Sequence, residues 1–197
     1  SLPQAWLYGD ADDLRLQQFT SAGWEVKVLK PKQLDTLLTQ NALPLMLWVR
    51  LPMSTSVLQG NPKHAYSGTM NLLNKLLERQ SRSDNFFLVE STRSNSNWDL
   101  LSSLKEVRSA HISWCSLEIG KGNTARPVNS TQVKTNLPLP STCFHCSCTQ
   151  PSQQHTVKLK EPEHIKAYVT ALCKVVLGCL AAAATVPESI STSNLKD

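Results

Sequence analysis

Residues 45–51 of the chain read LMLWVRL and are followed directly by Pro52. A short run that is apolar at nearly every position is typical of a strand that is buried on both faces of a parallel sheet. Residues 86–89, which read FFLV, form a second run of this kind. The two runs predict a parallel sheet with both faces covered, and this sets the fold class.

Strand-like and helix-like patterns alternate on both sides of these two runs. Further strands are predicted at residues 5–8, 24–29, 110–117, 131–135 and 156–159, and helices at residues 12–22, 32–40, 69–80, 98–107 and 163–184. Alternation of this kind predicts an α/β fold of Rossmann-like type, with a mostly parallel sheet and helices on both faces. Ligands of such folds bind beyond the carboxyl ends of the strands.

The chain length and composition predict one α/β domain over residues 1–185, because 197 residues suit a single core. Within it, residues 120–155 are polar and rich in proline, and we interpret them as a loop-rich insertion with Cys and His before the C-terminal helix. Residues 186–197 are rich in Ser and Thr and predict a flexible tail.

The cysteine content and the chain start predict an intracellular protein, cytoplasmic or nuclear. Six cysteines in 197 residues are too few for a disulfide scaffold, and the first residues do not resemble a secretory signal. The longest apolar stretch, at residues 175–186, is shorter than the roughly 20 residues that cross a bilayer. We therefore expect no membrane span.

Candidate catalytic residues follow the two buried runs. Glu90 comes directly after residues 86–89, and Ser54 and His64 lie in a long predicted loop at residues 53–67. A relay of Ser54, His64 and Glu90 is one hypothesis, although no G-x-S-x-G motif accompanies it. The alternative is that His64 is an ordinary solvated side chain.

Basic residues at strand ends and in loops are candidates for binding nucleic acid, in which cations contact phosphates and aromatic rings stack on bases. The net charge of +5 is compatible with this partner, and equally with an ordinary solvated rim. The candidate residues are Arg50, Lys63, Arg93, Trp98, Lys121, Arg126 and Lys134.

A cluster of Cys and His at the end of the insertion is a candidate zinc site. Cys143 and Cys146 have the C-x2-C spacing, and Cys148 and His155 supply two further donors nearby. The cluster lacks the longer spacing between two pairs of ligands that zinc motifs usually have, so reduced, partly buried thiols are the alternative. The remaining cysteines, Cys115, Cys173 and Cys179, lie in apolar runs and predict core packing.

Three short blocks carry a resemblance to a known family. They are residues 47–55 (LWVRLPMST), residues 86–94 (FFLVESTRS) with Trp98 beyond them, and residues 113–117 (SWCSL). The series resembles a domain of retroelement and viral polyproteins that is itself similar to cytosine-C5 DNA methyltransferases. In that family the first block ends in PPCST, the second reads LENP followed by Ser and Trp, and the third precedes a turn of Cys and Gly.

The departures from this pattern predict a degenerate enzyme. Met53 stands where the resemblance implies the nucleophilic cysteine, and a thioether cannot form the covalent adduct. Glu90 matches the family carboxylate, but Ser91 and Thr92 replace the Asn-Pro that follows it. The resemblance implies that the first turn, residues 9–13 with Gly9 and Asp10, contacts the cosubstrate S-adenosylmethionine. This turn has one glycine and three carboxylates, so its binding of the cosubstrate is doubtful. The carboxylates repel phosphate and could equally accept hydrogen bonds from hydroxyl groups or cap a helix.

Three functions follow as hypotheses. The first is a non-catalytic methyltransferase-like domain of a mobile element or virus that binds nucleic acid or serves in assembly with protein partners or itself. The second is an active enzyme, by methyl transfer or hydrolysis, that uses Glu90 with Ser54 or His64. The third is a purely structural subunit of a larger particle.

Overall fold

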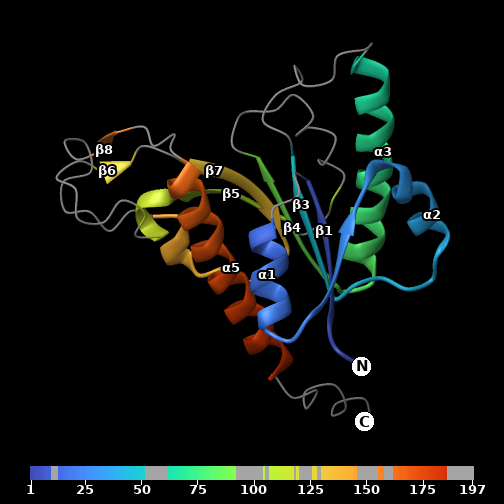
Figure 1. Cartoon of the computed structure of the whole chain (residues 1–197), viewed down its shortest axis with the longest axis horizontal. Coiled ribbons are helices and arrows are strands. Elements are labelled where there is room, and N and C mark those ends of the chain that lie inside the picture. The colour runs from blue at the N-terminus through green and yellow to red at the C-terminus, as the bar shows by residue number, and fades with distance from the viewer. Residues whose placement is uncertain are drawn as a thin grey trace, which may run out of the picture.

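The structure, a computed structural model, has a six-stranded sheet at its centre with strand order β2-β1-β3-β4-β7-β5 (Figure 1). It describes residues 1–9, 13–51, 62–91, 104, 107–117, 119, 126–127, 130–145, 155–157 and 162–185; for residues 13, 62–67, 126–127 and 155–157 it describes the backbone alone.

The strands of this sheet are β1 (Gln4–Tyr8), β2 (Glu25–Leu29), β3 (Met46–Arg50), β4 (Phe86–Ser91), β5 (Arg108–Ser113) and β7 (Ser130–Thr135). The helices are α1 (Asp13–Ser21), α2 (Leu34–Thr39), α3 (Pro62–Arg82) and α5 (Pro162–Ala184), with the 3-10 turns η1 (Pro31–Gln33), η4 (Trp114–Leu117) and η5 (Ser141–Cys143). A second, two-stranded sheet pairs β6 (Arg126–Pro127) with β8 (His155–Val157).

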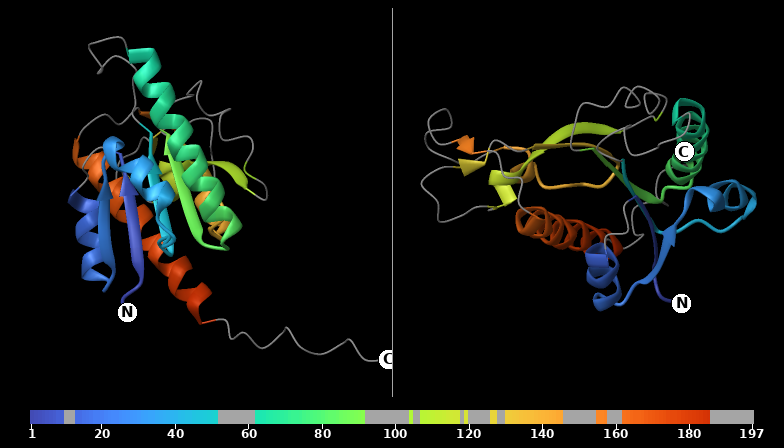
Figure 2. Two further views of the ribbon diagram at one scale, coloured as in Figure 1. Left: turned by 90° about the vertical axis from the view of Figure 1, so that its right-hand side faces the viewer. Right: turned by 45° about the horizontal axis from the view of Figure 1, so that its top comes forward.

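The first four strands of the order run parallel, which confirms the predicted α/β fold with a mostly parallel sheet. Alternate side chains of each strand face opposite layers. Trp48 and Leu88 pack with α1 and α5, whereas Leu47 and Phe87 pack with α2 and α3. Figure 2 shows the two helical layers on either side of the sheet.

Strand β7 is the main departure from the predicted architecture. It lies between β4 and β5 and is antiparallel to both, so it is a full member of the sheet and not part of a loop-rich insertion. Its inward residues Thr131, Val133 and Thr135 are buried. Just beyond the strand, the Asn136 side chain accepts a hydrogen bond from the Phe87 backbone N–H at 2.8 Å and extends the pairing with β4.

Helix α3 begins earlier than the sequence predicts. The periodicity of apolar residues starts at Met70, but the helix begins at Pro62, so Lys63 and His64 lie in its first turn and not in a loop. Proline suits the first helical position because its missing N–H has no intrahelical partner there. The prediction of a loop over residues 53–67 is therefore wrong for residues 62–67.

Two other predicted elements differ at their ends. The strand predicted at residues 110–117 ends at Ser113, and the turn η4 follows it. The helix predicted at residues 98–107 lies mostly outside the described residues, and Leu104 and Val107 are not helical.

Helix α5 contains most of the apolar stretch at residues 175–186 and begins 13 residues before it. Among the described residues, it is the one helix that is long and apolar enough to cross a bilayer by length and composition. Core helices pass the same test, and one face of α5, with Tyr168, Leu172 and Val176, packs against the sheet.

Candidate functional site

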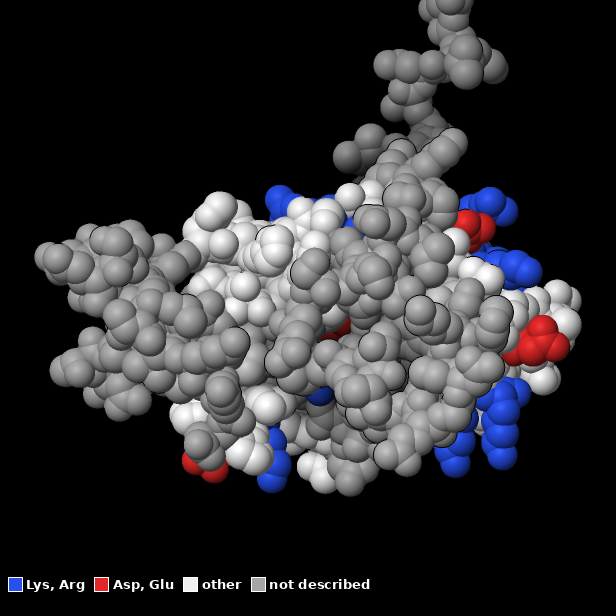
Figure 3. Space-filling model, turned by 90° about the horizontal axis from the view of Figure 1, so that it is seen from above, with Lys and Arg blue, Asp and Glu red and all other residues white. Residues whose placement is uncertain are grey.

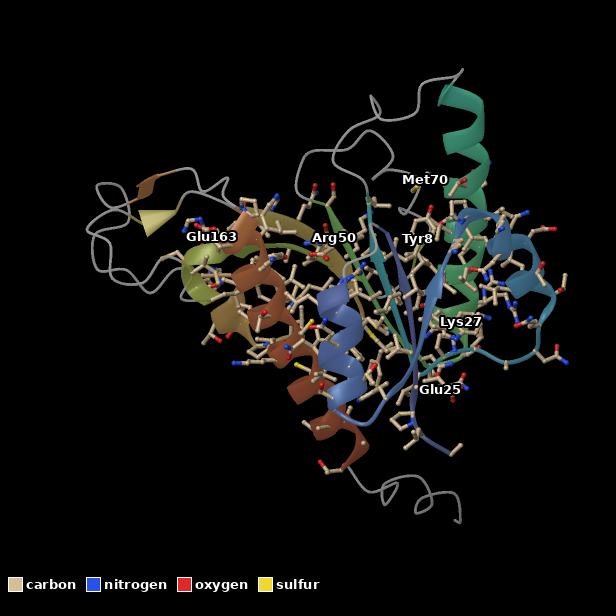
Figure 4. The ribbon with its side chains drawn as sticks, viewed as in Figure 1. Tyr8, Glu25, Lys27, Arg50, Met70 and Glu163 are labelled. Carbon is tan, nitrogen blue, oxygen red and sulfur yellow. The ribbon has the colours of Figure 1, made fainter. Side chains whose placement is uncertain are left out.

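The candidate site lies at the carboxyl edge of the parallel strands, where Gly9 follows β1, Arg50 ends β3, and Glu90 is the penultimate residue of β4. Arg50 and Glu90 are paired in the register of the two strands. Figure 4 shows Tyr8 and Arg50 near this edge. The edge is the expected ligand position in open α/β sheets.

The Glu90 carboxylate is fully buried and has a partner on each oxygen. Oε1 accepts a hydrogen bond from the Trp48 indole N–H at 3.0 Å and lies 3.2 Å from Nε of Arg50. Oε2 accepts a hydrogen bond from the Tyr168 hydroxyl at 3.1 Å. The carboxylate therefore connects β3, β4 and α5 in one buried network of charge-assisted hydrogen bonds.

The partners of Tyr168 extend this network toward the antiparallel end of the sheet. Its ring stacks on Trp114 with centroids 4.8 Å apart, and the Trp114 indole N–H donates to Thr131 Oγ1 at 3.0 Å. Burial, and then the neighbouring Glu90 carboxylate, raise the pKa of the Tyr168 hydroxyl well above its ordinary value. Tyr168 is thus a neutral hydrogen-bond donor and is unsuited to act as a base.

Gly9 brings the end of β1 close to Arg50. Its φ of +123° belongs to a region that side-chain-bearing residues rarely adopt, and a Cβ atom there would lie 2.6 Å from the Arg50 carbonyl oxygen. The glycine thus permits the close approach of two backbones inside the protein. Asp10, the second predicted contact for a cosubstrate, lies outside the described residues.

This geometry favours a structural role for Glu90. A general base must reach its substrate, but this carboxylate is fully buried and each of its oxygens is engaged by Trp48, Arg50 or Tyr168. In the network, Arg50 retains 14% exposure of its side chain, whereas Glu90 has none. Ser54 lies outside the described residues, and only the backbone of His64 is described, so their relay with Glu90 stays a prediction.

The structure separates the described candidates for nucleic-acid contact. Arg50 and the backbone of Lys63 lie at the carboxyl edge. Lys134 lies in the middle of the sheet, where it is paired with Val89. Because neighbouring residues of a strand face opposite sides and Val133 faces α1 and α5, Lys134 faces the side of α2 and α3. Figure 3 looks down on this edge, and Lys and Arg side chains of the described residues lie mainly around its rim. Backbone alone is described for Arg126, while Arg93, Trp98 and Lys121 lie outside the described residues.

The zinc hypothesis rests on residues of which the structure describes little. Cys143 is buried near Cys179; burial raises the pKa of both thiols, and the charge of Cys179 adds to the effect at Cys143. The backbone of His155 pairs with Arg126, and Cys146 and Cys148 lie outside the described residues. Within the described part of the chain, no group of three or more His, Cys, Asp or Glu residues could hold a metal. Cys115, Cys173 and Cys179 are buried, which confirms their predicted packing role.

The sequence did not identify Trp48 and Tyr168 as partners of Glu90. Trp48 could have been found, because it precedes Arg50 by two residues and so shares its face of the strand. Tyr168 is 78 positions from Glu90 in the sequence, and no local pattern signals that contact. In comparisons with known proteins, no protein-family model and no curated protein sequence matches this chain.

Proposed function

We propose that the chain is a methyltransferase-like domain, of the kind found in mobile elements or viruses, that does not transfer methyl groups and binds nucleic acid at the carboxyl edge of its sheet. The observation that carries this proposal is the engagement of both Glu90 oxygens inside the protein. A carboxylate committed in this way stabilises a scaffold and does not face a substrate.

A further feature of the sequence supports a domain that does not transfer methyl groups. Met53 stands in the position of the nucleophile and has no ionisable proton.

Binding of nucleic acid is supported by charge and position. The chain has a net charge of +5, and Arg50 and Lys63 come from two elements that meet at the same edge. A cation that contacts a phosphate releases counterions, which makes the affinity fall as salt is added.

The test is fluorescence anisotropy with labelled single-stranded RNA and DNA 20-mers between 50 and 200 mM salt. The wild-type chain should bind with a negative slope of log affinity against log salt, and Lys63→Glu should weaken binding and reduce the slope by about 0.7 or more. The matched control is Arg82→Glu, at the opposite end of α3, which should leave binding near the wild-type value. Equal effects of the two changes would contradict an edge-bound ligand.

Calorimetry with S-adenosylmethionine tests the other half of the proposal. No heat of binding is expected, whereas binding with methyl transfer to a nucleic acid would contradict it. Failure to bind nucleic acid at any salt concentration would instead favour the structural subunit of a larger particle.

A further inference from the structure

A groove runs along α5 on the side that faces η4 and the segment after β7. It consists of two adjoining depressions of about 550 and about 600 Å³, which share Lys174 and Val175. Ser116 and Leu117 line the first depression, and Pro138 and Pro140 line the second. The groove is distinct from the Glu90 network, which lies beneath the opposite, buried face of the helix.

Small apolar residues make up a large part of the floor of the groove. They are contributed by α5 at Ala167, Ala171, Gly178, Ala182 and Ala183. Among the described residues that line the two depressions, Lys174 is the one with a charge. The most apolar 18-residue window of α5 is apolar enough to pass for a membrane span by composition, and 39% of this window is buried inside the protein. The rest of the window is apolar surface that another molecule could contact.

The length and charge of the groove define what fits it. From Ala167 to Ala183 the floor is about 24 Å long at the helical rise per residue, which corresponds to four to five turns of a second helix. The small floor residues let another helix axis approach closely. Lys174 lies near the middle of this length, where an opposite charge on the occupant would be complementary.

We propose that this groove is the docking site for an amphipathic helix of a partner protein, four to five turns long, with a carboxylate near its middle. A second copy of α5 fits poorly, because Glu163, in the first turn, is the sole acidic residue of α5. An antiparallel pair that covered the whole groove would place Lys174 of one copy beside Lys174 of the other, and like charges in contact oppose association.

Gly178 offers a way to block the groove without disturbing the core. A Cβ at this exposed position meets nothing within 4 Å, and the same is true of Gly68 in α3. Gly178→Leu therefore fills the groove, and Gly68→Leu is its matched control on another helix. Both changes should leave the chain folded, because leucine favours a helix more than glycine does.

The probe is a displayed library of 18-residue helices, randomised at their apolar and central positions, selected on the full-length chain. Enriched helices should carry Asp or Glu near the centre and bind wild type and Gly68→Leu equally, with at least tenfold weaker binding to Gly178→Leu. Lys174→Glu should weaken the binding of these helices about three- to fivefold. A selection on the Lys174→Glu chain should instead enrich helices with a central Lys or Arg.

Several outcomes would overturn the proposal. One is a library that yields no helix able to distinguish Gly178→Leu from Gly68→Leu. Another is a wild-type dimer in sedimentation that Gly178→Leu dissociates, which would make a second copy the occupant. A third is binding of neutral phosphatidylcholine vesicles that Gly178→Leu abolishes, which would make a lipid surface the occupant of the groove. Affinity for nucleic acid should stay unchanged in Gly178→Leu, so this test is independent of the proposed function.

Discussion

Gly9 shows how one residue without a side chain determines the geometry at the carboxyl edge. Gly9→Ala should destabilise the protein by about 2–4 kcal/mol, because it combines a positive φ with a close backbone contact. The contact is with Arg50, whose carbonyl oxygen would lie 2.6 Å from the new Cβ. Urea unfolding monitored by circular dichroism measures the change.

Gly23 separates the two contributions. It also has a positive φ, of 84°, but a Cβ at this position meets nothing within 4 Å. Gly23→Ala should therefore cost about 1 kcal/mol, from backbone strain alone. If both changes cost the same, the close approach of Gly9 to Arg50 would have no energetic consequence.

The Glu90 network provides a second prediction for single residues. Glu90→Gln keeps the shape of the side chain but removes the buried charge that pairs with Arg50, and should cost about 3–5 kcal/mol. Tyr168→Phe removes one donor to the carboxylate and should cost about 1.5–3 kcal/mol. Chemical unfolding of the purified variants tests both values.

A carboxylate that keeps 30% exposure, Glu78, is the control for the fully buried Glu90. Glu78 lies 3.9 Å from Arg82, whose side chain is 79% exposed, so Glu78→Gln should change stability by about 0.5 kcal/mol or less. A Glu90→Gln variant as stable as Glu78→Gln would contradict the structural role assigned to this network.

Among the elements, α2 depends on a residue of its neighbour α3. The Arg79 guanidinium donates to the carbonyl oxygens of Leu38 and Gln40, both at 2.7 Å, and to that of Leu37 at 3.2 Å. Carbonyls at the end of a helix lack intrahelical partners, and a positive charge there also suits the helix dipole. One side chain thus caps the C-terminal end of this six-residue helix.

Arg79→Lys should therefore be poorly tolerated. An ammonium group lacks the planar fork that reaches three carbonyls, and we expect a loss of about 1–3 kcal/mol with faster amide exchange in α2. Arg82→Lys, three residues along the same helix and exposed, should change stability by less than about 0.5 kcal/mol. Amide exchange in α2 that is unchanged by Arg79→Lys would contradict this cap.

The sequence predicted elements well where their pattern is local. The buried runs became β3 and β4 because strands covered on both faces need apolar residues at every position. The start of α3 and the place of β7 were not predictable in this way. Pro62 begins a turn that has no apolar periodicity, and the alternating pattern of residues 131–135 gives a strand but not its neighbours.

The position of Glu90 in the sheet could be predicted from the sequence, and its hydrogen-bond partners could not. Glu90 at the end of a buried run was correctly expected in the sheet near the carboxyl edge. Whether a carboxylate faces solvent or the interior depends on the helix that packs above it, and Tyr168 of α5 is remote in sequence. Long-range packing of this kind leaves no periodic signal.

For the whole molecule, one buried tyrosine and two buried cysteines predict how stability depends on pH. The pKa of the Tyr168 hydroxyl is raised by burial and by Glu90, and the pKa values of the Cys143 and Cys179 thiols are raised mainly by burial. Above the ordinary pKa values of these groups the folded chain holds more protons than the unfolded chain. The contribution of these groups to the free energy of unfolding should therefore be fully present below about pH 9 and fall as pH rises further.

Urea unfolding at pH 8, 9, 10 and 11 measures this dependence. The double variant Cys143→Ala, Cys179→Ala should show a shallower fall between pH 9 and 10, and Tyr168→Phe should show a shallower fall above pH 10. A wild-type stability that stays constant from pH 8 to 11 would contradict the raised pKa values.

The position of β7 also orders the assembly of the chain in time. β5 is made before β7 on the ribosome, yet β7 is its one neighbour among the strands that the structure describes. On that basis β5 has no pairing partner until residue 135 has emerged. The parallel strands up to β4 meet no such delay. Nascent chains stalled with residues 1–129 emerged should therefore leave the amides of β5 open to hydrogen exchange, and protection of β5 in such chains would contradict this order.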